Sequence, residues 1–304
     1  MITTCTVNPS LDYYLEFRRP LHAGTNRSMI EYYEAGGKGI NISIVLSNLG
    51  IPTKAFGFVG GFTKDFFIKL LSKYEEIRPN FTYIENHTRI NVKCRYGADS
   101  DLNAMGPQIS PKEIRNLRDK VSRLSVGDYF AFSGAAQEDM EDDMVDMLKE
   151  LNSQGVEVVL DTNPKIIRRL LEEHPFMVKT TPDELEQILG YDLTTPEELI
   201  AGAKKVHELG AERVLLLCDK KTAFLFCDEG SFQVEIVDET AVNTVGTGDA
   251  MVAGFLMNYM RSRNNIDSFK YGACCGKATA YSTGFGTKNE IDSYYQQTEV
   301  QKLD

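Results

Sequence analysis

The feature that most limits the fold of this chain is the alternation of short apolar runs with longer amphipathic segments. The short runs are predicted to be strands: Ile2–Val7, Lys54–Val59, Tyr129–Phe132, Val156–Asp161, Phe176–Lys179, Val214–Cys218 and Ala223–Cys227. Several of them are apolar throughout, which is typical of strands buried on both faces of a sheet. The pattern therefore predicts an α/β fold with a mostly parallel central sheet.

The segments between these runs carry helix boundaries. Predicted helices over Gly39–Leu49 and Pro196–Leu209 each end directly before a glycine, which is a common C-terminal cap. Ser110 and Thr195 each begin a Ser/Thr-Pro-x-Glu sequence, which is a capping box with proline at the first helical position. Helices are thus expected between the strands.

Two segments break the alternation: Tyr13–Phe17 with Met29–Glu34, and Arg89–Tyr96 with Asp101–Ala104. In the second, apolar and polar residues alternate from position 90 to 96, which predicts a half-exposed antiparallel strand. We expect a small sheet inserted into the α/β body. Its polar face would cover a site, and its apolar face needs a cover, for which a second copy of the sheet is a candidate.

The chain's clearest chemical motif is Gly246-Thr-Gly-Asp249, followed by a run of small and apolar residues that is predicted to be a helix. Free backbone N–H groups at the start of a helix form an anion site. An anion bound at such a site would repel a neighbouring carboxylate, so the presence of Asp249 there needs a functional explanation. A base that deprotonates a hydroxyl about to attack a phosphate supplies one.

A second glycine-rich turn, Gly36-Gly-Lys-Gly-Ile-Asn41, precedes a predicted helix. Its glycines would let a ligand approach the backbone and Lys38 adds a positive charge, although such a turn alone is usually only a turn. Asp12 follows the first strand, where it is placed either to bind a polyol or to form an Asx turn.

Arg89, Asn91 and Lys93 share one face of their predicted strand. That face is either solvated or a wall that holds a phosphate. The common nucleotide loop, Gly-x-x-x-x-Gly-Lys-Ser/Thr, is absent, and Gly272–Lys277 is interpreted as helix packing.

Composition narrows the function. The net charge of −11, from 44 acidic and 33 basic residues, argues against nucleic acid or an anionic membrane as the main partner. The six cysteines form no Cys-x-x-Cys pair and the four histidines no metal-binding spacing. Without a predicted membrane span or signal segment, we expect a cytoplasmic protein with reduced thiols.

Five motifs occur together in one order: Asn8-Pro-Ser-Leu-Asp12, Gly36-Gly-Lys-Gly-Ile-Asn41, Thr88-Arg-Ile-Asn-Val-Lys93, Asp101-Leu-Asn103 with Gly106-Pro107, and Asn243-Thr-Val-Gly-Thr-Gly-Asp249. The set resembles the ribokinase-like (PfkB) carbohydrate kinases, most closely the 1-phosphofructokinase branch, with tagatose-6-phosphate kinases as close relatives. The resemblance implies one three-layer α/β/α domain over residues 1–304, with lid segments at about 12–35 and 88–105.

The resemblance also implies an activity. It would be the ATP-dependent, Mg²⁺-requiring phosphorylation of the free primary hydroxyl of a ketohexose phosphate, with fructose 1-phosphate to fructose 1,6-bisphosphate as the first expectation. A tagatose-6-phosphate kinase or another PfkB sugar kinase is the alternative. A homodimer that packs through the lid sheets is implied as well.

Site residues follow from the resemblance position by position. Asp249 would be the general base, and the backbone N–H groups of Gly246, Thr247 and Gly248 would form the anion hole. The substrate-binding set is Asp12, Arg27, Gly37, Lys38, Asn41, Arg89 and Asn103. The nucleotide-binding set is Lys179, Asp219, Lys220, Thr222, Thr244, Gly246 and Gly248. Glu184 would help to place the water ligands of Mg²⁺.

The chain departs from the family pattern at three places. Thr181 replaces the asparagine of the family's Asn-x-x-Glu and begins a capping box instead. Asp219 and Thr222 replace both glycines of the loop beside the adenosine. Ala135 replaces a serine after Gly134. The damaged nucleotide loop motivates a hypothesis of a different class, a non-catalytic sugar-phosphate-binding protein.

Overall fold

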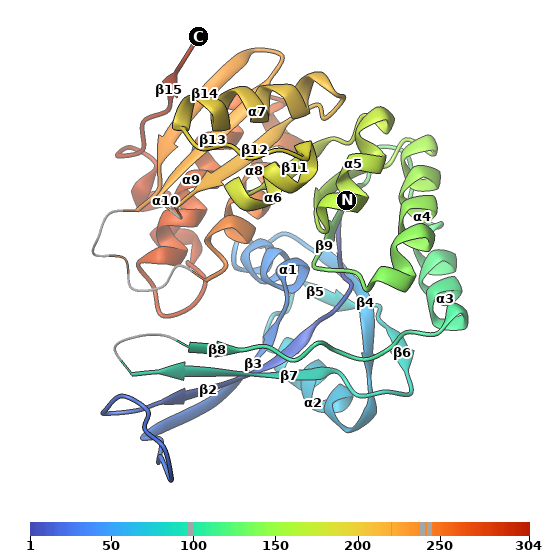
Figure 1. The fold of residues 1–304 in the computed structure, drawn as a ribbon, viewed down its shortest axis with the longest axis vertical. Helices are drawn as coiled ribbons and strands as arrows, with labels where there is room; N and C mark the ends of the chain where they lie inside the picture. The colour runs from blue at the N-terminus through green and yellow to red at the C-terminus, as the bar shows by residue number, and fades with distance from the viewer. Residues whose placement is uncertain (97–99, 220, 238–240, 242–244) are drawn as a thin grey trace.

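The computed structural model describes residues 1–304 except 97–99, 220, 238–240 and 242–244. One large sheet lies at its centre (Figure 1). The strands of this sheet are β1 Ile2–Thr6, β4 Thr53–Gly60, β5 Ile77–Pro79, β6 Thr82–Ile84, β9 Tyr129–Ser133, β10 Glu157–Asp161, β11 Met177–Thr180, β12 Val214–Cys218, β13 Thr222–Cys227, β14 Gly230–Glu235 and β15 Gln301–Lys302.

Neighbouring strands run in the order β15-β14-β13-β12-β11-β10-β9-β1-β4-β5, and β6 pairs with β4. All pairings from β12 to β5 are parallel, and only β13, β14 and β15 add antiparallel pairs at one edge. The mostly parallel α/β sheet is confirmed. All seven predicted strands are confirmed as well, with ends that shift by at most one residue.

The α-helices have clear sequence boundaries. They are α1 Lys38–Asn48, α2 Lys64–Leu71, α3 Pro111–Val121, α4 Glu141–Ser153, α5 Pro164–Leu170, α6 Pro182–Leu189, α7 Pro196–Glu208, α8 Thr247–Ser262, α9 Asn265–Ala280 and α10 Lys288–Tyr294. Capping boxes are confirmed at Ser110, Thr181 and Thr195, and a further one forms at Thr287. The predicted helices over Gly39–Leu49 and Pro196–Leu209 are confirmed as α1 and α7.

The large sheet separates two hydrophobic layers. On β12, Val214 and Leu216 pack into the core that α3 to α7 cover, whereas Leu215 and Leu217 pack into the core under α1, α8, α9 and α10. Alternate residues of one strand therefore serve opposite faces, as the pleat requires. The three-layer α/β/α arrangement is confirmed.

A second, four-stranded sheet extends from the body at the lower left of Figure 1, below α1. Its strands are β2 Ser10–Glu16, β3 Ile30–Gly36, β7 Arg89–Arg95 and β8 Ser100–Leu102, in the order β3-β2-β7-β8. The prediction of an antiparallel strand at 89–96 was only partly right, because β7 is antiparallel to β8 but parallel to β2. Its polar side chains Asn91 and Lys93 are buried, because they face the body instead of solvent.

Three smaller expectations can be compared with the structure. Gly272 packs against α8 so closely that a Cβ atom there would lie 2.7 Å from the Met251 carbonyl oxygen, which confirms its packing role. All six cysteines are free thiols. Of the helices in the described part of the chain, none is both long and apolar enough to cross a bilayer.

Candidate active site

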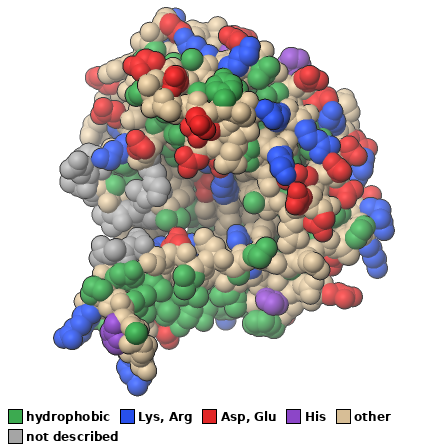
Figure 2. Space-filling model, in the orientation of Figure 1, with side chains coloured by type: hydrophobic (Ala, Val, Ile, Leu, Met, Phe, Trp, Pro, Cys, Tyr) green, Lys and Arg blue, Asp and Glu red, His purple; other side chains and the backbone are tan. Residues whose placement is uncertain are grey.

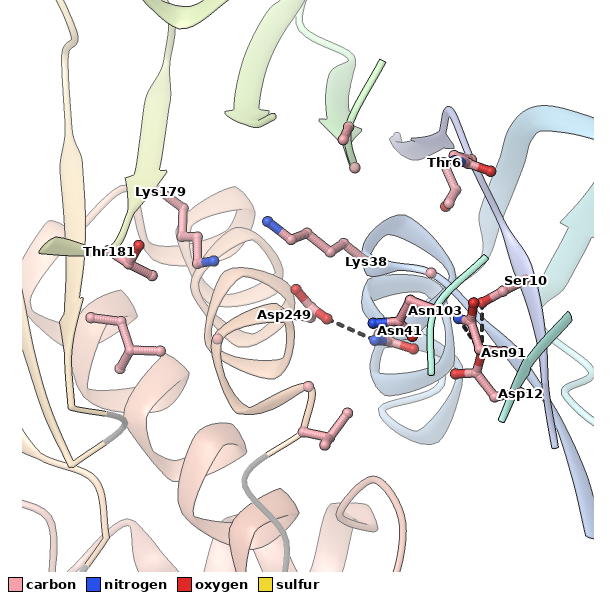
Figure 3. Close-up of a pocket in the computed structure, with 18 of the residues that line it drawn as sticks. Thr6, Ser10, Asp12, Lys38, Asn41, Asn91, Asn103, Lys179, Thr181 and Asp249 are labelled. Carbon is pink, nitrogen blue, oxygen red and sulfur yellow. Dashed lines mark hydrogen bonds between the residues drawn. The ribbon is translucent and has the colours of Figure 1, made fainter. Parts of the chain in front are cut away.

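A cavity of about 610 Å³ opens between the carboxyl edge of the large sheet, the lid sheet, and the first turns of α1 and α8. It lies in the hollow between body and lid in Figure 2 and is enlarged in Figure 3. β1 and β9 are neighbours in the sheet, but the next strand after β1, β4, lies on one side of this pair and the next strand after β9, β10, lies on the other. The strand order therefore reverses between β1 and β9. Ligands of open α/β sheets bind at such a reversal, beyond the carboxyl ends of the strands.

Most of the predicted site residues line this cavity: Asp12, Gly37, Lys38, Asn41, Arg89, Asn103, Lys179, Asp219, Gly246, Gly248 and Asp249. Glu184 and Thr247 lie beside it, Glu184 with one carboxylate oxygen 3.6 Å from Lys38 Nζ. Arg27 is exposed between β2 and β3 and does not line the cavity, nor does Thr222 on β13. Lys220 and Thr244 lie outside the described residues.

One end of the cavity is built by the lid. Asp12 Oδ1 accepts hydrogen bonds from Ser10 Oγ at 2.7 Å and from Asn91 Nδ2 at 2.9 Å. Gly36 makes room for this carboxylate, because a Cβ atom at that position would lie 2.5 Å from Asp12 Oδ2. The carboxylate is therefore held in one orientation, in which it can accept hydrogen bonds from a polyol.

Cationic side chains surround the same end. Arg89 donates from Nη1 to the Ala104 carbonyl at 2.9 Å and from Nη2 to the Asn8 carbonyl at 3.0 Å. Lys93 Nζ donates to Asp101 Oδ2 at 2.9 Å and to Asn103 Oδ1 at 3.2 Å. Burial lowers the pKa of Arg89 from its ordinary value. The predicted polar face of the strand is thus a cationic wall of the cavity, suited to an anionic group.

The opposite wall is the first turn of α8. Gly246 caps the helix with φ +77, and a Cβ atom there would lie 2.5 Å from the Phe285 ring. The Ala250 N–H donates to the Gly246 carbonyl at 2.9 Å, so the amides earlier in the turn have no acceptor within the helix. Those N–H groups and the positive end of the helix form an anion site.

Asp249 lies in this turn, buried and 6% exposed. The Asn41 side-chain amide on α1 donates to Asp249 Oδ2 at 2.7 Å (Figure 3). Burial, and then the negative charge of Asp161, raise the pKa of Asp249 to about 6, against the opposing effects of Lys179, Asn41 and Lys38. A carboxylate of this kind is ionised at neutral pH and is a stronger base than an exposed one, as general base catalysis favours.

Sequence analysis missed Asp161, the last residue of β10. Its Oδ1 atom lies 2.6 Å from Lys38 Nζ and 3.3 Å from Lys179 Nζ. Burial alone would raise the pKa of Asp161, but the two ammonium groups outweigh burial and lower the pKa. The signal was present in the sequence, because Asp161 ends a predicted buried strand, as Asp12 follows one. Lys38, predicted to bind the substrate, lines the cavity and lies beside Asp161.

The other end of the cavity carries the chain's departures from the family pattern. Asp219 has φ +48, the left-handed conformation that glycine adopts most easily, and its exposed side chain lines the cavity near Leu217. Thr181 caps α6 by accepting from the Glu184 N–H at 3.5 Å, and Glu184 Oε2 accepts from the Thr181 N–H at 3.0 Å. The capping box therefore keeps Glu184 at the cavity despite the threonine.

Eight buried side-chain polar atoms in the described part of the chain lack a hydrogen-bond partner. Six of them lie around the cavity: Thr6 Oγ1, Asn8 Oδ1, Arg89 Nε, Ser133 Oγ, Asp161 Oδ2 and Thr247 Oγ1. A buried polar atom that lacks a partner costs free energy, on the order of 1–3 kcal/mol. Their concentration at the strand ends indicates that the cavity is built to be filled by a polar ligand or by water.

The profile of the pfkB family carbohydrate kinases matches residues 18–292. The chain belongs to this family. The kinase is 33% identical to 1-phosphofructokinase of Bacillus subtilis over 304 residues, which cover both chains completely. It is 30% identical to D-tagatose-1-phosphate kinase of Bacillus licheniformis over 305 residues, again covering both chains.

The fold of the kinase is also that of phosphofructokinase-2 from Escherichia coli, whose structure contains substrates and products. The TM-score is 0.91 at 22% identity, with 97% of this chain and 98% of the other covered. The match to the family and the 33% identity to a 1-phosphofructokinase identify the protein as a carbohydrate kinase, a phosphotransferase with an alcohol acceptor.

Proposed function

We propose that the kinase transfers the γ-phosphoryl group of ATP to the free primary hydroxyl of fructose 1-phosphate, giving fructose 1,6-bisphosphate and ADP. The observation that carries this proposal is the position of Asp249. Its buried carboxylate lies between the anion site of α8 and the polyol-binding end of the cavity. A base at that junction is what phosphoryl transfer to a hydroxyl needs.

In this proposal Asp249 accepts the proton of the attacking hydroxyl, for which a gain of about 10²–10⁴-fold is typical. The N–H groups of Gly246, Thr247 and Gly248 stabilise the charge on the transferred phosphoryl group. Asp12 and Asn41 orient the sugar hydroxyls, while Arg89 and Lys93 lie where the sugar's own phosphate would bind. Most of the rate gain comes from positioning and charge stabilisation.

Magnesium fits the site only if it binds together with the phosphate groups of ATP. Among the described residues no group of three His, Cys, Asp or Glu side chains is arranged to hold a metal. Glu184 has one carboxylate oxygen in its capping box and the other 3.6 Å from Lys38 Nζ. Mg²⁺ keeps several waters and binds chiefly to substrate phosphates, so Glu184 would contact it through water. The ion would neutralise charge on the transferring phosphate.

The lid supports a proposal about assembly. Residues 1–304 would act as one kinase domain whose lid, at about 12–35 and 88–105, packs against the lid of a second copy. The edge strand β3 is exposed from Ile30 to Tyr33, and Met29 before it is 49% exposed. Tyr33 stacks on Tyr13 with ring centroids 4.3 Å apart. An exposed, apolar edge strand needs a cover in solution.

The activity is tested by measuring ADP release with fructose 1-phosphate, fructose 6-phosphate, tagatose 1-phosphate and tagatose 6-phosphate. The highest kcat/KM is expected with fructose 1-phosphate, and a higher value with a tagatose phosphate would identify the alternative substrate. No turnover with any of them, together with calorimetry that detects sugar-phosphate binding but no ATP binding, would favour a non-catalytic binding protein. Asp219 at the donor end is the observation behind that second candidate.

A further inference from the structure

Asp161 is a buried carboxylate for which the proposed mechanism has no direct use. It is 1% exposed, at the carboxyl end of β10. Its place is fixed by the sheet, because Asp161 pairs in register with Ser133 of β9, and Ser133 pairs with Thr6 of β1. The Asp161 carbonyl also accepts the Gly134 N–H at 3.0 Å. The carboxylate is thus mounted on rigid backbone at the strand reversal.

The two ammonium groups that meet this carboxylate come from opposite sides of the cavity. Lys38 begins α1, which also supplies Asn41 at the acceptor side. Lys179 lies on β11, next to the segment that leads to Thr181 and Glu184. One oxygen atom, Asp161 Oδ1, lies within ion-pair distance of both. Figure 3 shows the two ammonium groups pointing toward each other beside Asp249.

Lys179 also reaches the anion site of α8. A Cβ atom placed on Gly248 would lie 3.2 Å from Lys179 Cε and 3.7 Å from Lys179 Nζ. The end of this side chain therefore lies against the glycine whose N–H group we assign to the transferred phosphoryl group. The ammonium groups are consequently held where negative charge develops during transfer.

We propose that Asp161 is a positioning residue, which holds the ammonium groups of Lys38 and Lys179 side by side at the point where the phosphoryl group passes from donor to acceptor. Without it, two cations at short range would repel each other and turn toward separate partners. Lys38 is the less enclosed of the two, with a side chain that is 36% exposed, compared with 7% for Lys179. Asp161 therefore acts on the reaction chiefly through Lys38. This inference rests on the proposed phosphoryl transfer but not on the identity of the sugar.

The test is a double-mutant cycle of Asp161→Asn and Lys38→Met, with the sugar phosphate that the wild-type enzyme uses best. Asparagine keeps the shape of the side chain, removes its charge and turns an N–H group toward an ammonium group. We expect kcat of Asp161→Asn to fall by about 10²-fold, as a misplaced group at the reacting centre does, with KM for the sugar phosphate nearly unchanged. In the Lys38→Met background the same change should lower kcat by no more than about 3-fold.

The pH profile provides a second readout. Asp249 is faced by Asp161 from β10, by Lys179 from β11, and by Lys38 and Asn41 from α1. Removing the charge of Asp161 removes a neighbour that raises the pKa of Asp249, so the acid limb of kcat/KM should move to lower pH. This shift follows from the lost charge alone, so it identifies Asp249 as the titrating group, and the double-mutant cycle decides whether Asp161 positions Lys38.

Asp142→Asn is the matched control, because it makes the same change on α4 in an exposed ion pair with Arg169 of α5, and it should leave kcat unaltered. If Asp161→Asn does not fold, both substitutions of the cycle are made in a Lys179→Met background. Asp161→Asn then removes the buried carboxylate from a protein that already lacks one buried cation. The inference would be overturned if Asp161→Asn lowered kcat by the same factor in the wild-type and Lys38→Met backgrounds. It would also be overturned if Asp161→Asn raised only the KM for the sugar phosphate. Inactivity of the wild-type enzyme on every sugar phosphate would instead overturn the proposed function.

Discussion

The side-chain amide of Asn41 on α1 donates a 2.7 Å hydrogen bond to Asp249 Oδ2 on α8. This bond joins the helix that follows the glycine-rich turn to the helix that carries the proposed base. It orients one carboxylate oxygen and leaves the other, Oδ1, for a substrate hydroxyl. The two helix starts thereby meet at the proposed reaction centre, and their coupling can be tested.

Asp249→Asn should lower kcat by roughly 10²–10⁴-fold, because the amide cannot accept the hydroxyl proton. Binding of sugar phosphate should persist, since the lid residues that hold it are untouched. Steady-state kinetics and calorimetry measure the two effects separately. Turnover close to that of the wild-type enzyme would show that another group is the base.

The kcat/KM of the wild-type enzyme should rise with pH through about 6, the pKa to which burial and Asp161 raise Asp249, and then level off. The base works only when deprotonated, so activity is lost below that pKa. Asn41→Ala removes a hydrogen bond that lowers the pKa, and the acid limb should move to higher pH. Asn48→Ala, on the same helix but bonded to Phe285 and Gly286 carbonyls, is the control and should not move it.

Arg89→Ala should raise KM for the sugar phosphate by roughly 10- to 100-fold, because a hydrogen bond to a charged group contributes about 1.5–3 kcal/mol. KM for ATP should stay constant, since Arg89 lies at the lid end of the cavity. Initial-rate kinetics with each substrate varied in turn gives both constants. Arg118→Ala, in an exposed ion pair with Glu150, should change neither. An equal rise in both KM values would contradict the assignment.

Asp219→Gly should lower KM for ATP, because it removes a negative charge from the proposed donor end of the cavity. It should also stabilise the protein by about 1 kcal/mol, since a left-handed conformation is strained in residues other than glycine. Kinetics and urea unfolding measure these effects. His174→Gly, at a second left-handed position that does not line the cavity, is the control and should leave KM for ATP unchanged. An unchanged or higher KM for ATP would mean that Asp219 assists the donor.

Ile30→Glu should convert the proposed dimer into monomers, because it places a charge on the exposed edge strand β3, where Ile30 is 50% exposed. The molar mass is measured by sedimentation or light scattering. Val126→Glu, which changes a side chain that is 81% exposed in a turn, should leave the mass unaltered. A wild-type monomer at working concentration would refute the dimer itself.

The sequence predicted the strands, the layers and most cavity residues, because buried runs, capping boxes and glycine turns are local signals. It did not predict partners that only the fold brings together. Other predicted strands also end in polar residues, so its place at a strand end does not single out Asp161. No local sequence pattern shows that Lys38 and Lys179 converge on its carboxylate. The pairing of β7 with β2 was missed for the same reason, since strand direction depends on distant connections.

For the polar strand face, the sequence allowed either a solvated surface or the wall of a phosphate site. Asn91 and Lys93 alternate with apolar residues, as a solvated strand face would, and only the body opposite the lid makes them buried. The turn at Asp219 requires a positive φ, a conformation that favours glycine, yet the residue there is aspartate. The residue type therefore gave no local signal of this conformation.

The long sequence separations in the site set an order in which it can be completed during synthesis. Asp12 and Asn91, which share a hydrogen bond, are 79 residues apart in the sequence. Asn41 and its hydrogen-bond partner Asp249 are 208 residues apart. A chain emerging from the ribosome therefore has its sugar-binding half long before its base. With Asp249 as the proposed base, catalysis begins only when α8 has been made and docked, so enzyme activity reports a chain that is translated past α8.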